Sequence, residues 1–191
     1  MVLPACGLLR GKTAIVTGGV TGIGRAITLE YLRQGCNVAV NHLGLQRDEE
    51  LRQGLHAEAQ KLKAGELVDL AGDISKPRTS QELVSKAVAK WGKLDICVAN
   101  AGVFKPANFL EIEEKVYRQS MSVNIDDTQL ADHELKDAAK VKYLEKRIPL
   151  GRVGRPEEMA GPAVFLASED FSSFVNGSGL LADGGMFVNL Q

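Results

Sequence analysis

A glycine loop between a predicted strand and a predicted helix constrains this 191-residue chain more than any other feature. The β-branched run Thr13–Thr17 leads directly into Gly18, and Gly22 and Gly24 follow before apolar residues recur at helical spacing. Glycines at these positions permit tight backbone turns and let the helix pack close to the strand. A strand, a glycine loop and a helix N-terminus are the context of a pyrophosphate site, so we predict that a dinucleotide binds here.

Short apolar runs alternate with helical patterns through the first two-thirds of the chain. Strands are predicted at 13–17, 37–41, 67–71 and 94–99, and a helical pattern separates each from the next. This order predicts an α/β fold, in which helices cover both faces of a doubly wound parallel sheet. The length fits one domain that spans residues 1–191.

The last third of the chain has a different pattern. Helices are predicted over Asp132–Arg147 and Pro156–Ser168, the second with a proline and two glutamates in its first turn. Leu180–Ala182 is the only further strand predicted, just before Gly184 and Gly185. The chain after the fourth predicted strand therefore contains fewer strands than the regular alternation of strands and helices before it would predict.

Charge, cysteine content and hydropathy exclude several classes of function. The formal net charge is −1, which gives no electrostatic footprint for nucleic acid. Three scattered cysteines, Cys6, Cys36 and Cys97, indicate neither a disulfide framework nor a metal site, and we expect Cys97 in the core. No apolar run approaches the about 18 residues of a membrane span, and no signal peptide is evident. We expect a cytoplasmic protein with no membrane partner.

The end of the second predicted strand bears on which dinucleotide binds. An acidic residue about 20 residues beyond the loop would bind the ribose hydroxyls of NAD. Asn41 and His42 stand there instead, and Arg47 is near in sequence. No carboxylate at this position would repel a 2′-phosphate, so we favour NADP, with NAD as the alternative. His42 is either a direct cofactor contact or a solvated loop histidine.

Two further strand ends contribute to the predicted site, because ligands of open α/β sheets bind at the carboxyl ends of strands. Asp73 either accepts a hydrogen bond from the adenine amino group or caps the turn near Ser75. Asn100 and Gly102 either line the cofactor or form an ordinary turn. The predicted cofactor-binding residues are Gly18, Thr21, Gly22, Ile23, Gly24, His42, Asp73, Ile74, Asn100, Ala101 and Gly102.

As a set, these motifs resemble those of the short-chain dehydrogenase/reductase family. The resemblance covers 11–125 and 128–191, and its motifs are Thr17–Gly24, Gly72–Ile74, Asn100–Gly102, Val123–Ile125, Arg152–Glu158 and Asp183–Gly185. Gly19–Ala26, Asn41–Leu43 and Gly184–Gln191 are most similar to fungal sugar dehydrogenases of the L-rhamnose 1-dehydrogenase type. The resemblance implies a Rossmann-like fold and NAD(P)-dependent oxidation or reduction of a sugar, polyol or small carbonyl compound.

The chain departs from the family at the catalytic residues. The resemblance gives Asn124 as the catalytic asparagine, but the family also uses a serine and a Tyr-x3-Lys pair. The residues four positions after the three tyrosines are not lysines: Tyr31 is followed by Gly35, Tyr117 by Met121 and Tyr143 by Arg147. Val123–Ile125 runs almost directly into Thr128–Leu130, which resembles a later part of the family. At about 30 residues per strand–helix unit, roughly 60 residues are missing near 125–128, or two strands and two helices.

Two hypotheses follow from this departure. In the first, the chain represents an NADP-dependent enzyme in shortened form. In the second, it is an inactive module that binds NADP or a partner subunit. Without the missing strands, either Leu180–Ala182 pairs with the fourth strand or that strand is a bare edge.

By resemblance, the C-terminal helix and strand form a homo-oligomer interface. Its apolar members are Met159, Ala163, Val164 and Leu180. In the alternative, Met159 and Val164 face the domain's own core.

Overall fold

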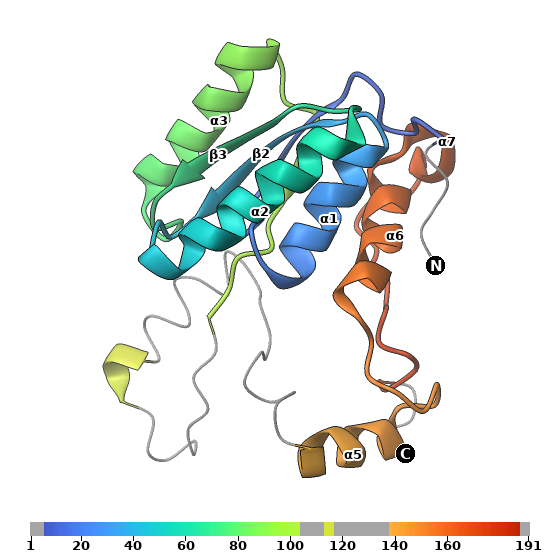
Figure 1. The fold of residues 1–191 in the computed structure, drawn as a ribbon. Coiled ribbons are helices and arrows are strands. Elements are labelled where there is room, and N and C mark those ends of the chain that lie inside the picture. The colour runs from blue at the N-terminus through green and yellow to red at the C-terminus, as the bar shows by residue number, and fades with distance from the viewer. Residues whose placement is uncertain (1–5, 104–112, 117–137, 188–191) are drawn as a thin grey trace.

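The computed structural model describes residues 6–103, 113–116 and 138–187. Four parallel strands form one sheet in the order β3-β2-β1-β4 (Figure 1). They are β1 (Thr13–Val16), β2 (Asn37–His42), β3 (Leu67–Ala71) and β4 (Ile96–Val98). The predicted α/β fold with a doubly wound parallel sheet is therefore confirmed. Each of the four predicted strands is present, β3 with the predicted ends and the other three with slightly different ends.

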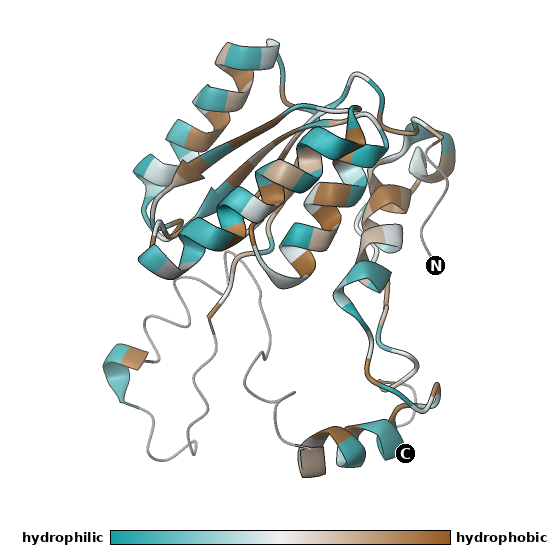
Figure 2. Ribbon diagram, in the orientation of Figure 1, coloured by the Kyte–Doolittle hydropathy of each residue, from teal (hydrophilic) through white to brown (hydrophobic). Residues whose placement is uncertain are grey.

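Helices cover both faces of this sheet. Residues of α1 (Gly22–Arg33), α2 (Gln46–Leu62) and α6 (Pro156–Ala167) share one hydrophobic cluster with β1 and β2. Residues of α3 (Pro77–Trp91) form a smaller cluster on the other face. Figure 2 shows hydrophobic residues along the strands and polar residues on the outward sides of α2 and α3. The core therefore lies between the sheet and these two helical layers.

The C-terminal part of the chain contributes two more helices. These are α5 (Ala138–Arg147) and the short α7 (Glu169–Ser172). Residues 132–137 of the predicted helix over Asp132–Arg147 lie outside the described residues. No helix in the described parts of the chain is long and apolar enough to cross a membrane.

The start of α6 is fixed by its own sequence. Pro156 occupies the first turn, where a missing backbone N–H costs nothing. The Glu158 carboxylate accepts from the Arg155 backbone N–H at 2.8 Å and from both terminal nitrogens of Arg152. These hydrogen bonds, first that of Arg152, lower the pKa of Glu158 to about 2. The Arg-x2-Arg-Pro-Glu-Glu pattern is thus a helix start, as predicted.

The prediction of a strand at Leu180–Ala182 is wrong, because these residues have no strand structure. Leu180 is 50% exposed and Leu181 is 62% exposed. A strand needs a hydrogen-bonded neighbour, and within the described residues β4 pairs with β1 alone. β4 is therefore an edge strand. The prediction that Cys97 belongs to the core is wrong for the same reason, since its side chain is exposed on this edge.

The packing of α6 against α1 also overturns part of the predicted oligomer interface. Val164 is 2% exposed within the core cluster, and the hydroxyl of buried Tyr31 donates to the Ala163 backbone oxygen at 3.0 Å. Met159 is half-buried and Leu180 lies outside any strand. Val164 therefore stabilises the domain itself and is not available to a second subunit.

Truncation variants on α6 test this assignment. Val164→Ala should lower the free energy of unfolding by about 2 kcal/mol, because two buried methyl groups are lost. Leu166→Ala removes more atoms, but Leu166 is 49% exposed, so the cost should be smaller. Urea denaturation of the two variants measures the difference. A larger loss for Leu166→Ala would contradict the assignment of Val164 to the core.

Candidate functional site

The parallel sheet brings the predicted cofactor-binding segments together at one end of the sheet, which the carboxyl ends of the strands form. Backbone hydrogen bonds connect these ends. Gly19 N–H donates to the Asn41 oxygen at 3.1 Å, Gly72 N–H donates to the His42 oxygen at 2.8 Å, and Thr17 N–H donates to the Val98 oxygen at 3.0 Å. Asn41 Nδ2 also donates to the Gly72 oxygen at 2.9 Å. All four strand ends therefore form one connected rim.

Thr17 and Asn100 join the glycine loop to the end of β4. The Thr17 hydroxyl oxygen accepts from the backbone N–H groups of Asn100 and Ala101, both at 2.9 Å. Asn100 Nδ2 donates back to the Thr17 carbonyl at 2.9 Å and lies 3.4 Å from the Gly18 oxygen. Asn100 is 6% exposed. The Asn100 side chain is thus buried and supports the loop. Its role is more structural than that of a residue that only lines a cofactor.

Gly24 packs against this support at a distance that excludes any larger residue. A Cβ on Gly24 would meet the Gly18 oxygen and Asn100 Nδ2, both well inside van der Waals contact. The first turn of α1 can therefore lie directly against the loop only because residue 24 is glycine. This is the helix–strand packing role that the sequence predicted for Gly24.

The N-terminus of α1 is suited to an anion. Gly18 and Gly22 have φ values of +61° and +50°, which turn the backbone ahead of the helix. The N-cap residue Thr21 makes no side-chain capping hydrogen bond, and the first turn contains no acidic residue. A Cβ on Gly22 would meet nothing within 4 Å, so open space lies beside the loop. Uncapped N–H groups and the positive end of the helix dipole are what a pyrophosphate binds, and the residues present fit a dinucleotide.

His42 at the end of β2 is buried, and both of its ring nitrogens have partners. The Gly44 N–H donates to Nδ1 at 3.1 Å, so Nδ1 is an acceptor. Nε2 lies 3.3 Å from Asp69 Oδ2, so it is assigned as the N–H donor to that carboxylate. The side chain is 6% exposed. His42 is thus neither a solvated loop residue nor a ring with an available nitrogen.

Asp69 is the centre of a polar cluster that the sequence analysis did not single out. His56 Nε2 lies 2.6 Å from Asp69 Oδ1, and Arg52 lies 3.5 Å from the same oxygen. Burial alone would raise the pKa of Asp69, but hydrogen bonds from His56 and His42 hold it below its ordinary value. The sequence signal was present, since a carboxylate inside the apolar strand Leu67–Ala71 needs partners.

Asp73 and Ile74 follow β3 at the same rim. Asp73 is exposed, and its Oδ1 accepts from the Ser75 backbone N–H at 3.0 Å. That geometry is the turn-capping alternative. The hydrogen bond from Asp73 to adenine and the contact of Ile74 with the cofactor stay predictions. Ala101 and Gly102 lie at the rim after Asn100 and are half-buried.

The predicted catalytic residue is Asn124. Asn124 and residues 125–128 are outside the described residues. Tyr31 is buried in the core, where burial raises the pKa of its hydroxyl. Tyr143 is 55% exposed on α5, and its hydroxyl accepts from Arg147 at 2.6 Å. Figure 1 shows α5 apart from the sheet. Neither described tyrosine has a lysine partner of the Tyr-x3-Lys kind.

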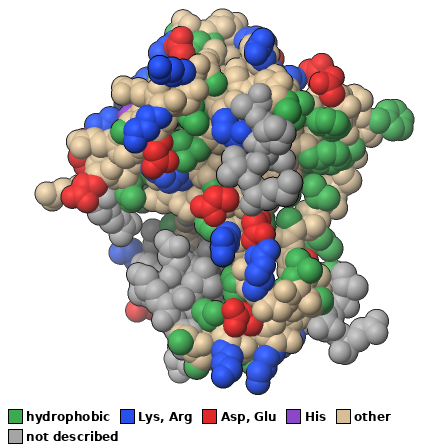
Figure 3. Space-filling model, turned by 45° about the vertical axis from the view of Figure 1, so that its right-hand side comes forward, with side chains coloured by type: hydrophobic (Ala, Val, Ile, Leu, Met, Phe, Trp, Pro, Cys, Tyr) green, Lys and Arg blue, Asp and Glu red, His purple; other side chains and the backbone are tan. Residues whose placement is uncertain are grey.

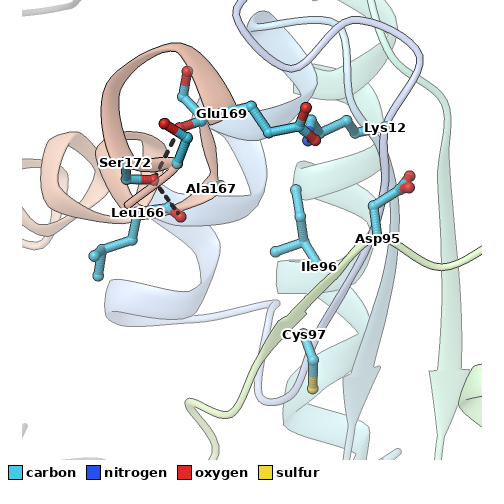
Figure 4. A pocket seen from close by; sticks show the side chains of 10 residues that line it. Lys12, Asp95, Ile96, Cys97, Leu166, Ala167, Glu169 and Ser172 are labelled. Carbon is cyan, nitrogen blue, oxygen red and sulfur yellow. Dashed lines mark hydrogen bonds and ion pairs between the residues drawn. The ribbon is translucent and has the colours of Figure 1, made fainter. Parts of the chain in front are cut away.

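A hollow of about 360 Å³ lies at the opposite end of the sheet, beside the first residues of β4. Figure 4 shows it between the first residues of β4 and the end of α6 with α7, lined by Lys12, Asp95, Ile96, Cys97, Leu166, Ala167, Ser168, Glu169, Ser172 and Ser173. The predicted cofactor-binding residues lie at the other end of the sheet, where the strands have their carboxyl ends. The hollow is thus separate from the candidate cofactor site.

Comparisons with known proteins agree with this geometry. Residues 12–134 match the family described as short chain dehydrogenase, which is more than half of the chain. The chain belongs to the short-chain dehydrogenase family. Its members use NAD(P), in keeping with the rim around Gly18–Gly24. Residues 125–187 also match the family described as enoyl-(acyl carrier protein) reductase.

Among curated relatives, an L-rhamnose-1-dehydrogenase of Scheffersomyces stipitis is 35% identical, covering 97% of this chain and 99% of the relative. An L-rhamnose 1-dehydrogenase (NAD(P)(+)) of Sphingomonas sp. is 30% identical, covering 96% and 99%. A solved structure of a putative short-chain dehydrogenase/reductase from Burkholderia xenovorans has a TM-score of 0.82 at 19% identity, covering 96% of this chain and 99% of that chain. The last comparison shows the fold alone.

The short-chain dehydrogenase relatives contain more residues than this chain. The alignment with the Scheffersomyces stipitis protein runs over 260 positions, whereas the chain has 191 residues, so at least 69 positions have no counterpart here. The two family matches meet within 125–134.

The Asp69 cluster predicts a pH dependence of stability. Because the folded-state pKa of Asp69 is lowered, the ionised cluster stabilises the protein above the unfolded-state pKa of about 4. That contribution is lost as pH falls through the lowered pKa, since the unfolded chain then binds the proton more readily. The gap in unfolding free energy between wild type and Asp69→Asn should therefore close below pH about 4. Asp73→Asn, at an exposed carboxylate, is the control. A gap that persists or grows in acid would contradict the cluster.

Proposed function

We propose that the chain is the dinucleotide-binding part of an NADP-dependent sugar dehydrogenase of the L-rhamnose 1-dehydrogenase type. The observation that carries the proposal is the uncapped N-terminus of α1 behind the positive-φ residues Gly18 and Gly22. The sugar substrate is inferred from two relatives named for L-rhamnose oxidation that span nearly the whole chain. A hydroxyl-bearing sugar carbon would then be the hydride donor, and the nicotinamide would accept the hydride.

The loop from Gly18 to Gly24 holds the cofactor pyrophosphate in this proposal. Backbone N–H groups of the first α1 turn, including that of Ile23, donate to the phosphate oxygens, and the helix dipole favours their charge. Asp73 and Ile74 bind the adenine, and Asn100 to Gly102 line the cofactor beyond it. Asn100 acts chiefly by fixing Thr17 and Gly18 through its buried amide.

The preference for NADP over NAD rests on the surroundings of Asn41 and His42. The strand itself ends in Asn41 and His42 and so has no acidic residue at the position that binds the ribose hydroxyls of NAD. The carboxylates nearest to His42 are Asp69, 3.3 Å from Nε2, and Asp48, 3.9 Å from Nδ1. Both oxygens of the Asp69 carboxylate are engaged, Oδ2 by His42 and Oδ1 by His56.

The proton-transfer residues of the family are incomplete in the proposed enzyme. Asn124 is the one catalytic residue that the sequence supplies. An unperturbed tyrosine has a pKa near 10, too high to exchange a proton with a sugar hydroxyl at neutral pH without a cationic neighbour. We therefore infer that the 191-residue chain binds cofactor without turnover and that about two strand–helix units are absent near 125–128. The 260-position alignment and the meeting of the family matches at 125–134 support this position.

We also propose that the protein acts in the cytoplasm and binds neither nucleic acid nor membrane. The net charge of −1 gives no attraction to polyanions. Cys6, Cys36 and Cys97 form no disulfide, which fits a reducing compartment.

Replacing Gly22 tests the cofactor site. Gly22→Val should abolish NADPH binding, because the side chain would fill the open space beside the loop and oppose the φ of +50°. Gly161→Val, where a Cβ also meets nothing within 4 Å, is the matched control and should bind normally. NADPH fluorescence titration measures both, with circular dichroism to confirm folding. Tighter binding of NADH than of NADPH would overturn the cofactor preference.

Hydride transfer tests the missing catalytic residues. The purified chain with NADP⁺ and L-rhamnose should produce NADPH at the background rate, because general acid–base catalysis by the absent tyrosine is lost. Absorbance at the nicotinamide band gives the rate. Turnover above background that disappears in Tyr143→Phe would show that Tyr143, beside Arg147, replaces the missing residue and would disprove the proposal.

A further inference from the structure

The side chain of His42 lies where the end of β2, the start of α2 and the end of β3 meet. The His42 backbone oxygen accepts from the Gly72 N–H, and Nδ1 of its ring accepts from the Gly44 N–H in the loop between β2 and α2. A Cβ on Gly44 would meet the Cβ of Ala71 at 2.9 Å, so this loop lies close against the last residue of β3. Figure 1 shows the start of α2 beside the carboxyl ends of β2 and β3. The ring therefore holds the β2–α2 loop at the rim formed by the strand ends.

Two carboxylates from different elements flank this ring. Asp69 of β3 lies 3.3 Å from Nε2, and Asp48 of α2 lies 3.9 Å from Nδ1. Asp48 is 8% exposed, and its Oδ2 accepts from the Leu45 backbone N–H at 3.1 Å. The side chain of His42 is itself 6% exposed. A buried imidazole thus lies between two acidic groups, one at each nitrogen.

Other charged groups around the ring act through Asp69. His56 and Arg52 of α2 lie 2.6 Å and 3.5 Å from Asp69 Oδ1, and Arg52 also pairs with Glu49 at 2.8 Å. Lys86 of α3 donates to the Asp69 backbone oxygen at 2.5 Å. Among the described residues, Asp69 and Asp48 are therefore the charged groups that face the His42 ring directly.

A proton on Nδ1 would change the partners of the ring. The nitrogen and the Gly44 N–H would then both be donors, so their hydrogen bond would be lost. Asp48 Oδ2, 3.9 Å away, is an acceptor that a small rotation of the ring brings within hydrogen-bond distance. The proton comes from solvent, and it adds one positive charge beside the loop. Protonation therefore exchanges Gly44 for Asp48 as the partner of Nδ1 and releases the Gly44 N–H.

We propose that protonation of His42 at Nδ1 strengthens the preference of the cofactor site for NADP over NAD. The inference rests on the proposed function, because it describes a regulation of the same site. The added charge attracts the 2′-phosphate, and the released Gly44 N–H is a donor for a phosphate oxygen. NAD has a neutral hydroxyl in place of that phosphate and gains little from either change. The preference for NADP should therefore increase as pH falls through the range of imidazole titration, about pH 8 to 5.

The effect is local to His42. His56 shares the Asp69 carboxylate, but its ring is 31% exposed on α2 and its printed partner is Asp69, not the β2–α2 loop. Elsewhere on the molecule acidic and basic side chains are intermixed, as Figure 3 shows for one face, so no large patch of one sign dominates the potential there. His56 is therefore a matched comparison for His42, with the same acidic partner and no contact with the loop.

Fluorescence titrations with NADPH and NADH at about pH 8 and about pH 6.5 test the proposal. In wild type, the ratio of the NADH to the NADPH dissociation constant should be about threefold larger at the lower pH, the effect of part of a charge near the phosphate. His42→Gln should lose this increase, because only the 2′-phosphate then titrates, near pH 6. His56→Gln should keep it. Circular dichroism confirms that each variant is folded.

A second measurement needs no cofactor. In the nucleotide-free protein, the NMR signal of the Gly44 amide should shift with the same midpoint pH as the His42 ring, and this amide should exchange faster below that midpoint. Asp48→Asn keeps an oxygen that can accept from the Leu45 N–H but removes one flanking charge. In this variant the shared midpoint should move to lower pH, because the protonated ring loses a charged partner.

Every other result overturns the proposal. A wild-type ratio that changes with pH no more than that of His42→Gln would show that His42 does not control the preference, and loss of the increase in His56→Gln would assign it to the other histidine. A Gly44 amide that does not follow the His42 ring would disprove the exchange of partners. Binding of neither nucleotide at either pH would overturn the proposed function together with this inference, whereas binding of both with a constant ratio would overturn this inference alone.

Discussion

The contact between Gly24, the Gly18 carbonyl and the Asn100 amide is the constraint on which the cofactor rim depends. With no side chain at residue 24, the first turn of α1 lies against the loop, and the Asn100 amide ties that loop to the end of β4. Thr17 completes the link by accepting two backbone hydrogen bonds. The direction of the α1 N-terminus, and therefore the place where phosphates bind, follows from this small set of close contacts.

Much of this could be predicted from the sequence because it is local. β1 is buried throughout and β2 from Val38 onward, and their β-branched and apolar cores, Ala14–Val16 and Val38–Val40, are typical of parallel strands covered on both faces. The positive φ values of Gly18 and Gly22 follow from a loop that must reverse between strand and helix. The start of α6 could also be predicted from the sequence, since Pro156 and Glu158 act within one turn.

The remainder depends on contacts between residues far apart in the chain. Helical spacing alone did not show that Val164 packs against α1, because spacing is the same for a core face and an interface face. Leu180–Ala182 has strand-like residues, yet in the described part of the chain it joins no strand of the sheet. Cys97 is exposed for the related reason that β4 is the edge of the described sheet. The contact of His42 with Asp69 could not be predicted for the same reason, because the two residues meet only after folding.

The central claim is that a complete cofactor rim persists in a chain without the proton-transfer residues of its family. Amide hydrogen exchange with and without NADPH tests it most directly. The account predicts slower exchange in the first turn of α1, in the residues after β3 and in the residues after β4, with no change around the hollow beside β4. Exchange that NADPH leaves unaltered at these three strand ends, or protection confined to the hollow beside β4, would contradict it.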